Sequence, residues 1–288
     1  MNISDRSDIL VIPRSSELYP AEWKTIKDAP TELYAKGNTA LLENRKFTVV
    51  GSRRTPVNAL KLGMTVSAEL AHTFTIVTGC ADGGDLAAIE GGLMGANKVI
   101  CVLAGGFGAL PQSNLPLLER VARNGLLLAL HPYDTAVRSF SYEYRNKLLA
   151  ALGEGTLVLG AGETSGALIT AKYAVKAQKP TFAFPYPPNS AVGCGCNGLI
   201  KNGAYLTENA QDIFDKLGVK ATAAEKPKVP LTADEEKMLS ALRELTEGHI
   251  NELSAKAGVP VFRTRAVLSA LEVKGLAVSV GGNRYAPV

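Results

Sequence analysis

The stretch that decides the fold is KFTVVGSRRTPVNALKLGMTVSAELAHTFTIVTG, residues 46–79, where two short apolar runs flank a helical pattern. The runs at 47–50 and 75–77 lack the apolar–polar alternation of half-exposed strands, which is typical of parallel strands covered on both faces. Between them, residues 58–71 carry apolar side chains at helical spacing. This order predicts a parallel strand–helix–strand unit.

The same alternation continues along the chain. Further apolar runs lie at 99–103, 126–130, 156–159 and 181–184, and amphipathic helical patterns lie at 85–95, 142–152 and 166–177. We therefore expect an α/β fold with a Rossmann-like, doubly wound, mostly parallel sheet over residues 46–217. Residues 1–45 are short of periodic patterns and bear prolines, so we expect an irregular N-terminal arm against the sheet edge.

The pattern changes after residue 217. Residues 218–230 contain two prolines and no apolar periodicity, which predicts an interdomain linker. In residues 231–288, Thr232 with Glu235 forms a capping-box pattern, and three helical patterns precede a hairpin pattern around Gly281. This order predicts a small C-terminal winged-helix-like domain. Units of this class bind DNA or proteins, and the pattern favours neither.

The composition excludes several classes of protein. The chain has 288 residues, 46% of them apolar and 20% charged, with a formal net charge of +4, so it is neither disordered nor collagen-like. We find no apolar stretch of about 18 residues and expect no membrane association and a cytoplasmic location. The four cysteines fit a reduced compartment. Cys194 and Cys196 have no nearby third ligand, so we expect no metal site.

Glycine-rich loops follow the predicted strands. The first, Gly51-Ser52-Arg53-Arg54, joins a tight turn and a hydroxyl to two guanidinium groups suited to phosphate. The second begins at Gly79, and further loops span 103–108 and 160–170. Glycine is common in such turns, and solvated arginines are the ordinary alternative. Four such loops at one sheet edge nevertheless predict a phosphate site for a nucleotide or a nucleic acid.

Enzyme signatures are mostly missing. The first turn lacks G-x-G-x-x-G, and the chain lacks both the phosphate-binding G-x-x-x-x-G-K-[ST] loop and a G-x-S-x-G nucleophile elbow. The acidic side chains Asp82, Asp85, Glu90 and Glu163 could serve as acid/base groups on a nucleotide. That alternative resembles the LOG-type nucleotide hydrolases, although their P-G-G-x-G-T-x-x-E motif is absent.

The segment Phe140–Lys147 predicts a second contact with nucleic acid. It places Arg145, Asn146 and Lys147 beside the rings of Phe140, Tyr142 and Tyr144 at the start of a helix. Basic side chains can hold phosphates while aromatic rings stack on unpaired bases, at roughly 1–3 kcal/mol per base. The alternative is a solvated helix with a tyrosine stripe in the core.

Four stretches in order resemble the DprA/Smf family of bacterial DNA-processing proteins: VVGSRR, SFSYEYRNKLLAAL, GAGETSGALITAKYAVKAQKPTFAFP and CNGLIKNGAYL. The resemblance covers about residues 17–217 and implies a Rossmann-like homodimer that binds single-stranded DNA. It further implies delivery of that DNA to a RecA-type recombinase in recombination and natural transformation. No catalytic residue and no cofactor belongs to the implied activity.

The resemblance also implies site residues. Gly51, Ser52 and Arg53 match the family's phosphate-contacting loop. The family's F-x-x-R-N region is matched, with one extra residue, by Phe140, Arg145, Asn146 and Lys147. Ser165 and Gly166 open the most specific match, residues 165–171.

The sequence also departs from the family pattern. Asp82 stands where an arginine is usual and Ile89 where a histidine is usual, and an acid there should weaken or redirect phosphate binding. The loop 186–196 is unusual. We therefore expect a non-enzymatic protein that binds single-stranded DNA, with phosphates held by Arg53, Arg54, Arg145 and Lys147. The alternatives are a LOG-like nucleotide-binding protein or hydrolase and an adaptor that docks a partner through its C-terminal domain.

Overall fold

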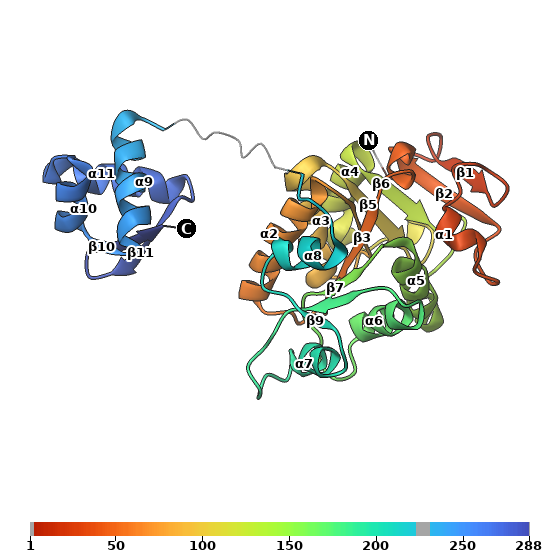
Figure 1. Ribbon diagram of the computed structural model, residues 1–288. Coiled ribbons are helices and arrows are strands. Elements are labelled where there is room, and N and C mark those ends of the chain that lie inside the picture. The colour runs from red at the N-terminus through yellow and green to blue at the C-terminus, as the bar shows by residue number, and fades with distance from the viewer. Residues whose placement is uncertain (1–2, 223–230, 288) are drawn as a thin grey trace. The chain divides into compact units, whose positions relative to one another are not determined.

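The structure, a computed structural model, describes residues 3–222 and 231–287 (Figure 1). These residues belong to two compact units, Met1–Ala223 and Ala224–Val288. Of the linker predicted at 218–230, residues 223–230 lie outside the described residues. Within the described parts of the chain, no helix is both long and apolar enough to span a membrane.

The first unit is built on one nine-stranded sheet. Its strands lie in the order β1-β2-β6-β5-β4-β3-β7-β8-β9, and all pairs from β6 to β9 are parallel. The sequence predicts the six strands from β3 to β8 and their parallel arrangement, and the structure confirms them. The strands are β1 (Leu10–Pro13), β2 (Glu32–Gly37), β3 (Lys46–Val50), β4 (Thr75–Thr78), β5 (Val99–Leu103), β6 (Leu126–Ala129), β7 (Thr156–Val158), β8 (Thr181–Ala183) and β9 (Tyr205–Leu206).

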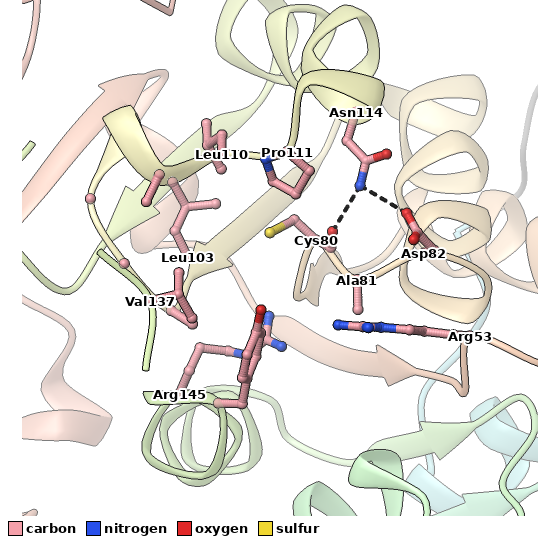
Figure 2. A pocket seen from close by; sticks show the side chains of 15 residues that line it. Arg53, Cys80, Ala81, Asp82, Leu103, Leu110, Pro111, Asn114, Val137 and Arg145 are labelled. Atoms are coloured by element: carbon pink, nitrogen blue, oxygen red, sulfur yellow. Dashed lines mark hydrogen bonds between the residues drawn. The ribbon is translucent and has the colours of Figure 1, made fainter. Parts of the chain in front are cut away.

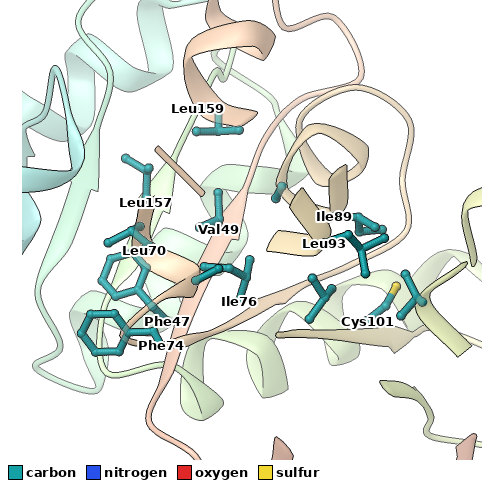
Figure 3. Close-up of a cluster of buried hydrophobic side chains, with 14 of the residues drawn as sticks. Phe47, Val49, Leu70, Phe74, Ile76, Ile89, Leu93, Cys101, Leu157 and Leu159 are labelled. Atoms are coloured by element: carbon teal, nitrogen blue, oxygen red, sulfur yellow. The ribbon is translucent and has the colours of Figure 1, made fainter. Parts of the chain in front are cut away.

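Helices cover both faces of this sheet, as the unbroken apolar runs require. Every residue of β3 to β8 is buried. On β3, Phe47 and Val49 join one hydrophobic core, shown in Figure 3, while Val50 joins the core on the opposite face. This division gives the three-layer, doubly wound architecture that the sequence predicts.

The helices divide between the two cores. Residues of α2, α3, α4 and α8 pack in the core of Phe47, and residues of α1, α5, α6 and α7 pack in the core of Val50. The helices are α1 (Ala21–Lys24), α2 (Val57–Ala71), α3 (Gly84–Ala96), α4 (Leu115–Asn124), α5 (Ser139–Leu152), α6 (Gly166–Lys176), α7 (Cys194–Lys201) and α8 (Ala210–Leu217), with short 3-10 turns at Thr39–Leu42, Phe107–Ala109 and Gln112–Asn114.

The N-terminal segment differs from the irregular arm that the sequence predicts. It adds two strands to the sheet, because β2 pairs antiparallel with β6 and β1 pairs antiparallel with β2. Lys36 interrupts the apolar pattern of β2, which hides the strand from a periodicity argument. Its side chain is fully buried, and its ammonium group pairs with Asp8 and donates to the carbonyl of Asp5. Trp23 anchors the segment, because its indole N–H donates to the Leu148 carbonyl at 2.9 Å.

The order of the strands creates a crevice between β3 and β7. From β3 the chain adds β4, β5 and β6 in one direction, and it then returns to place β7 on the other side of β3. The loops after β3 and β7 therefore diverge to opposite faces of the sheet. In open α/β sheets such a switch point, at the carboxyl ends of the strands, is where ligands bind.

The second unit contains three helices and a small antiparallel sheet of order β10-β12-β11. Its elements are α9 (Ala233–Leu245), β10 (Gly248–His249), α10 (Ile250–Ala257), α11 (Val261–Val273), β11 (Ala277–Gly281) and β12 (Arg284–Pro287). The capping box is present, since the Glu235 amide donates to Thr232 Oγ1 and the Thr232 amide donates to Glu235 Oε2. The predicted helices and hairpin are thus observed, while the winged-helix class stays a prediction.

Candidate nucleic-acid interface

Ser52 fixes the loop that follows β3. Its amide donates to the Gly160 carbonyl at 2.8 Å, which ties the loop to the one after β7. Its hydroxyl accepts from the Arg54 amide at 3.1 Å, and its carbonyl accepts from Thr55 Oγ1 at 2.8 Å. The backbone from Gly51 to Thr55 is therefore held from both ends, while the side chains of Arg53 and Arg54 remain exposed.

Two glycines let this loop lie directly on the start of α3. A Cβ atom added to Gly84 would lie 2.3 Å from the Cα atom of Gly51, which is too close for any side chain. The Gly84 amide donates to the Ser52 carbonyl at 3.2 Å. The loops after β3 and β4 thus form one packed layer, and the sequence predicted both of them only as separate glycine-rich turns.

The carboxylate of Asp85 joins the loop after β3 to the loop after β4. It accepts from the amides of Gly51 and Ala81, each at 3.3 Å. Burial raises the pKa of the Asp85 carboxyl, while the nearby Arg145 guanidinium and the two amides act in the opposite direction. A side chain only 4% exposed and engaged in this way has a structural function in the site.

Arg145 and Asn146 connect α5 to its neighbours. Arg145 is 4% exposed; its Nη1 donates to the Val102 carbonyl at 3.1 Å, and its Nε donates to Asn146 Oδ1 at 3.0 Å. Asn146 Nδ2 in turn donates to the Gly166 carbonyl at 3.1 Å. Arg145 is therefore a buried cation beside Asp85 at the base of the site, and the solvated helix that the sequence left as the alternative does not describe this side chain.

A groove of about 560 Å³ opens at the switch point. The loop after β3 forms one wall, and the loop after β7 with the first turn of α6 forms another. The Ser165 hydroxyl accepts from the Ala167 amide at 3.3 Å and so caps α6 at this wall. Eight of the predicted site residues line the groove together: Gly51, Ser52, Arg53, Arg54, Arg145, Asn146, Ser165 and Gly166.

The free charge in the groove is mainly positive. Among the residues that the structure describes, no hydrogen bond or ion pair engages the guanidinium group of Arg53 or of Arg54. Of the acids that line the groove, Asp85 is buried under the loops, and Glu163 is exposed at the rim. The N-terminus of α6 adds a positive helix-dipole end. The groove therefore suits an anionic group with several oxygens.

Three predicted site residues lie outside this groove. Lys147 pairs with Asp28 at 2.5 Å and lines a different hollow, beside Tyr173 and Lys176. Phe140 is 64% exposed on the first turn of α5 and does not line the groove. Gly79 is buried beneath it, where a Cβ atom would lie 1.8 Å from Arg145 Nη1. Lys147 is separated from its neighbours because successive side chains on a helix point about 100° apart.

A second, smaller pocket of about 190 Å³ adjoins the groove (Figure 2). Arg53, Ala81, Tyr142 and Arg145 line both hollows. Asn114, which lines the smaller pocket, carries no signal in the sequence, because it lies in a short 3-10 turn that contains neither a glycine nor a charged side chain. Tyr142 stands out in the sequence only as one of several rings in the stretch that forms α5.

The two cysteines of the C-x-C pair lie on one helix, α7. Cys196 is buried in α7, whereas Cys194 is exposed at the start of the same helix. Within residues 3–222 and 231–287, no three side chains of His, Cys, Asp or Glu are grouped so that they could hold a metal ion.

Fold and site together define a Rossmann-like protein with an arginine-lined groove at the switch point of its sheet. The sequence model of the family described as DNA recombination-mediator protein A matches residues 10–218. The chain belongs to this family.

Individual relatives agree with this assignment. The chain is 34% identical to DNA processing protein DprA of Bacillus subtilis over 212 residues, which cover 73% of this chain and 71% of the relative. The X-ray structure of DprA from Streptococcus pneumoniae matches with a TM-score of 0.69 and 31% identity, over 73% of this chain and 75% of that one. DNA processing protein A from Helicobacter pylori, whose structure is described for its single-stranded DNA binding mode, matches with a TM-score of 0.67 and 30% identity, over 75% of this chain and 98% of that one.

Proposed function

We propose that this chain binds single-stranded DNA, with the phosphates of the strand held in the groove between β3 and β7. The observation that carries the proposal is the pair of exposed guanidinium groups, Arg53 and Arg54, on a loop whose backbone is fixed from both ends. Guanidinium forks bind phosphate oxygens in a bidentate manner. The α6 N-terminus at the opposite wall favours the same negative charge.

A single strand fits the surroundings of the groove better than a duplex does. Tyr142 is 41% exposed and lines the groove, and Phe140, two residues earlier on the same helix, is 64% exposed. Aromatic rings beside a cationic groove are the arrangement on which unpaired bases stack. In a duplex the bases are already stacked on one another, and rings at this position would have no partner.

The groove acids support a function without a catalytic step. Asp85 accepts two amide hydrogen bonds beneath the loops, which leaves it poorly placed to exchange a proton with a bound nucleotide. This arrangement does not favour a LOG-like hydrolase, which would need an accessible acid/base pair. We therefore propose a binding protein that uses neither a cofactor nor a metal.

The family's description as a recombination mediator supports a further step, in which the bound strand passes to a RecA-type recombinase in the cytoplasm during natural transformation. We also propose that the chain forms a homodimer. The edge strand β9 supports this, because Tyr205 and Leu206 are both exposed on it. The second unit we assign to the winged-helix class, on the order of its three helices and its hairpin.

The test of DNA binding is a charge reversal at the loop after β3. We expect Arg53→Glu combined with Arg54→Glu to lower the affinity for a short oligo-dT strand at least about tenfold, because phosphate contacts dominate such binding. The matched control is Lys61→Glu combined with Arg123→Glu, which changes the charge equally on exposed helix surfaces outside the groove. Equal losses in the two double variants, with unchanged circular dichroism, would contradict the proposed site.

A further inference from the structure

The smaller pocket beside the groove has walls of contrasting chemistry. Figure 2 shows Leu103, Leu110 and Val137 toward one side of the pocket and Arg53 and Asp82 toward the other. Its volume is about 190 Å³, and one water needs roughly 10–15 Å³ of such space, so the pocket accommodates more than about ten water-sized groups. That is the scale of a nucleobase.

A fixed carboxylate lines this pocket. The Asn114 amide, itself 5% exposed, donates from Nδ2 to Asp82 Oδ1 at 3.1 Å and to the Cys80 carbonyl at 3.2 Å. Its Oδ1 accepts from Ser113 Oγ at 3.1 Å, so the orientation of the amide is set from both ends. In the part of the chain that the structure describes, no cation pairs with Asp82 within salt-bridge distance. The carboxylate therefore presents unused acceptor capacity to the pocket.

The pocket and the groove are neighbours that share lining residues. Arg53 and Arg145 line both hollows, as does Tyr142, whose ring is 41% exposed. A strand whose phosphate lies at Arg53 in the groove thus has its attached base within reach of the pocket. A carboxylate would repel a phosphate here, whereas it would accept hydrogen bonds from a base.

We infer that this pocket is a nucleobase subsite of the bound strand and that Asp82 makes it select guanine. The inference rests on the proposed binding of single-stranded DNA. The Watson–Crick edge of guanine carries two adjacent donors, N1–H and the N2 amino group, which match the two oxygens of one carboxylate. Adenine and cytosine place a ring acceptor beside their single amino group. Thymine is the least suited, because two carbonyl oxygens flank its N3–H and face the carboxylate.

Wild-type protein alone provides the first test. An oligo-dT strand is compared with strands of the same length in which one central residue is dG, dA or dC. We expect the dG strand to bind about tenfold more tightly than oligo-dT, with dA and dC between them, since a bidentate base contact is worth about this much. Binding of all four strands with equal affinity would overturn the subsite and leave the DNA-binding proposal intact. No binding of any strand would contradict the DNA-binding proposal itself.

The second test assigns the preference to Asp82. In Asp82→Ala and Asp82→Asn the ratio of dG to dT affinity should fall toward one, even if removal of a negative charge tightens the binding of all strands. Glu163→Gln removes the same charge at the rim of the groove and should keep the ratio. An unchanged ratio in both Asp82 variants, with thermal unfolding like that of the wild type, would overturn the assignment.

A third test compares binding of a guanine base within a strand with binding of the free nucleotide. The probe is 2′-deoxyguanosine 5′-monophosphate, which lacks the neighbouring phosphates that the groove would hold. We expect it to bind at least about a hundredfold more weakly than the dG strand, because linked contacts add effective concentration. Equal affinity for the mononucleotide and the strand would overturn the inference that the pocket serves a strand.

Discussion

Gly79 shows how the absence of a side chain positions the buried cation of the site. A Cβ atom at this position would lie 1.8 Å from Arg145 Nη1 and 2.4 Å from Asp85 Oδ2. Arg145 can therefore approach Asp85 and the Val102 carbonyl only because residue 79 is glycine. The sequence indicated Gly79 as a loop residue near phosphate, whereas the structure assigns it to the packing beneath the groove.

Gly79→Ala should therefore destabilise the first unit. We expect the free energy of unfolding to fall by about 1–3 kcal/mol, the usual cost of overpacking, as measured by urea denaturation. Gly198→Ala is the matched control, because nothing lies within 4 Å of its added Cβ atom and the residue lies inside α7. That change should stabilise the protein by roughly 0.5–1 kcal/mol. A neutral Gly79→Ala variant would contradict the packing described here.

Cys80 reports on the smaller pocket, which it lines. The neighbouring Cys101 thiol and the charge of Arg145 hold the pKa of the Cys80 thiol below its usual value of 9.0, although burial acts in the opposite direction. Only the thiolate reacts with iodoacetamide. The alkylation rate of Cys80 should therefore rise with pH through a midpoint below 9.0.

Bound oligonucleotide should slow the alkylation of Cys80, as followed by mass spectrometry of its peptide. The exposed Cys194 serves as an internal reference, because it lies away from this pocket on α7. If bound oligonucleotide slowed the alkylation of neither cysteine, the strand would bind away from the smaller pocket. Cys101 and Cys196 should stay unmodified, since burial raises the pKa of both thiols.

At the scale of elements, α5 explains why residues adjacent in sequence separate in function. Successive residues on a helix are rotated by about 100°. Arg145 and Asn146 are therefore buried, whereas Lys147 points away from them and pairs with Asp28. The periodicity of the sequence predicts the helix itself. It does not reveal which flank faces the groove, because tyrosines and small apolar residues occur all round the helix.

Lys147→Glu should consequently behave unlike Arg53→Glu. We expect Lys147→Glu to change the affinity for oligo-dT by no more than about threefold, because its charge is largely screened from the groove at physiological salt. Arg53→Glu alone should reduce that affinity at least about tenfold. Fluorescence anisotropy with a labelled strand measures both. A loss as large for Lys147→Glu would show that the strand crosses the hollow beside Tyr173 instead.

The sheet core and its edges differ in how far the sequence predicts them. Strands β3 to β8 are evident because each is an unbroken apolar run buried on both faces. Strand β2 is not evident, because Lys36 near its end is buried. This lysine is tolerated only because it pairs with Asp8 and donates to the Asp5 carbonyl, and hydrophobic periodicity does not reveal these contacts. In the same way, the loop glycines predict a site at the sheet edge. The tie of Asp85 to two loops depends on contacts that only the fold creates.

At the scale of the whole molecule, the modest net charge of +4 matters less than the placement of a few cations. Two exposed arginines and a helix N-terminus meet at the switch point of the sheet, while other basic side chains are engaged in ion pairs, such as Arg45 with Glu154 and Arg120 with Glu90. Binding through so few phosphate contacts should be of moderate strength and sensitive to salt.

The salt dependence of binding tests this account most directly. The affinity for oligo-dT is measured at several salt concentrations for the wild type and for Arg53→Ala combined with Arg54→Ala. Each phosphate contact on a single strand contributes about 0.7 to the slope of log affinity against log salt, so loss of two contacts should reduce the slope by about 1.4. An unchanged slope in the double variant would contradict the claim that these two arginines hold the strand.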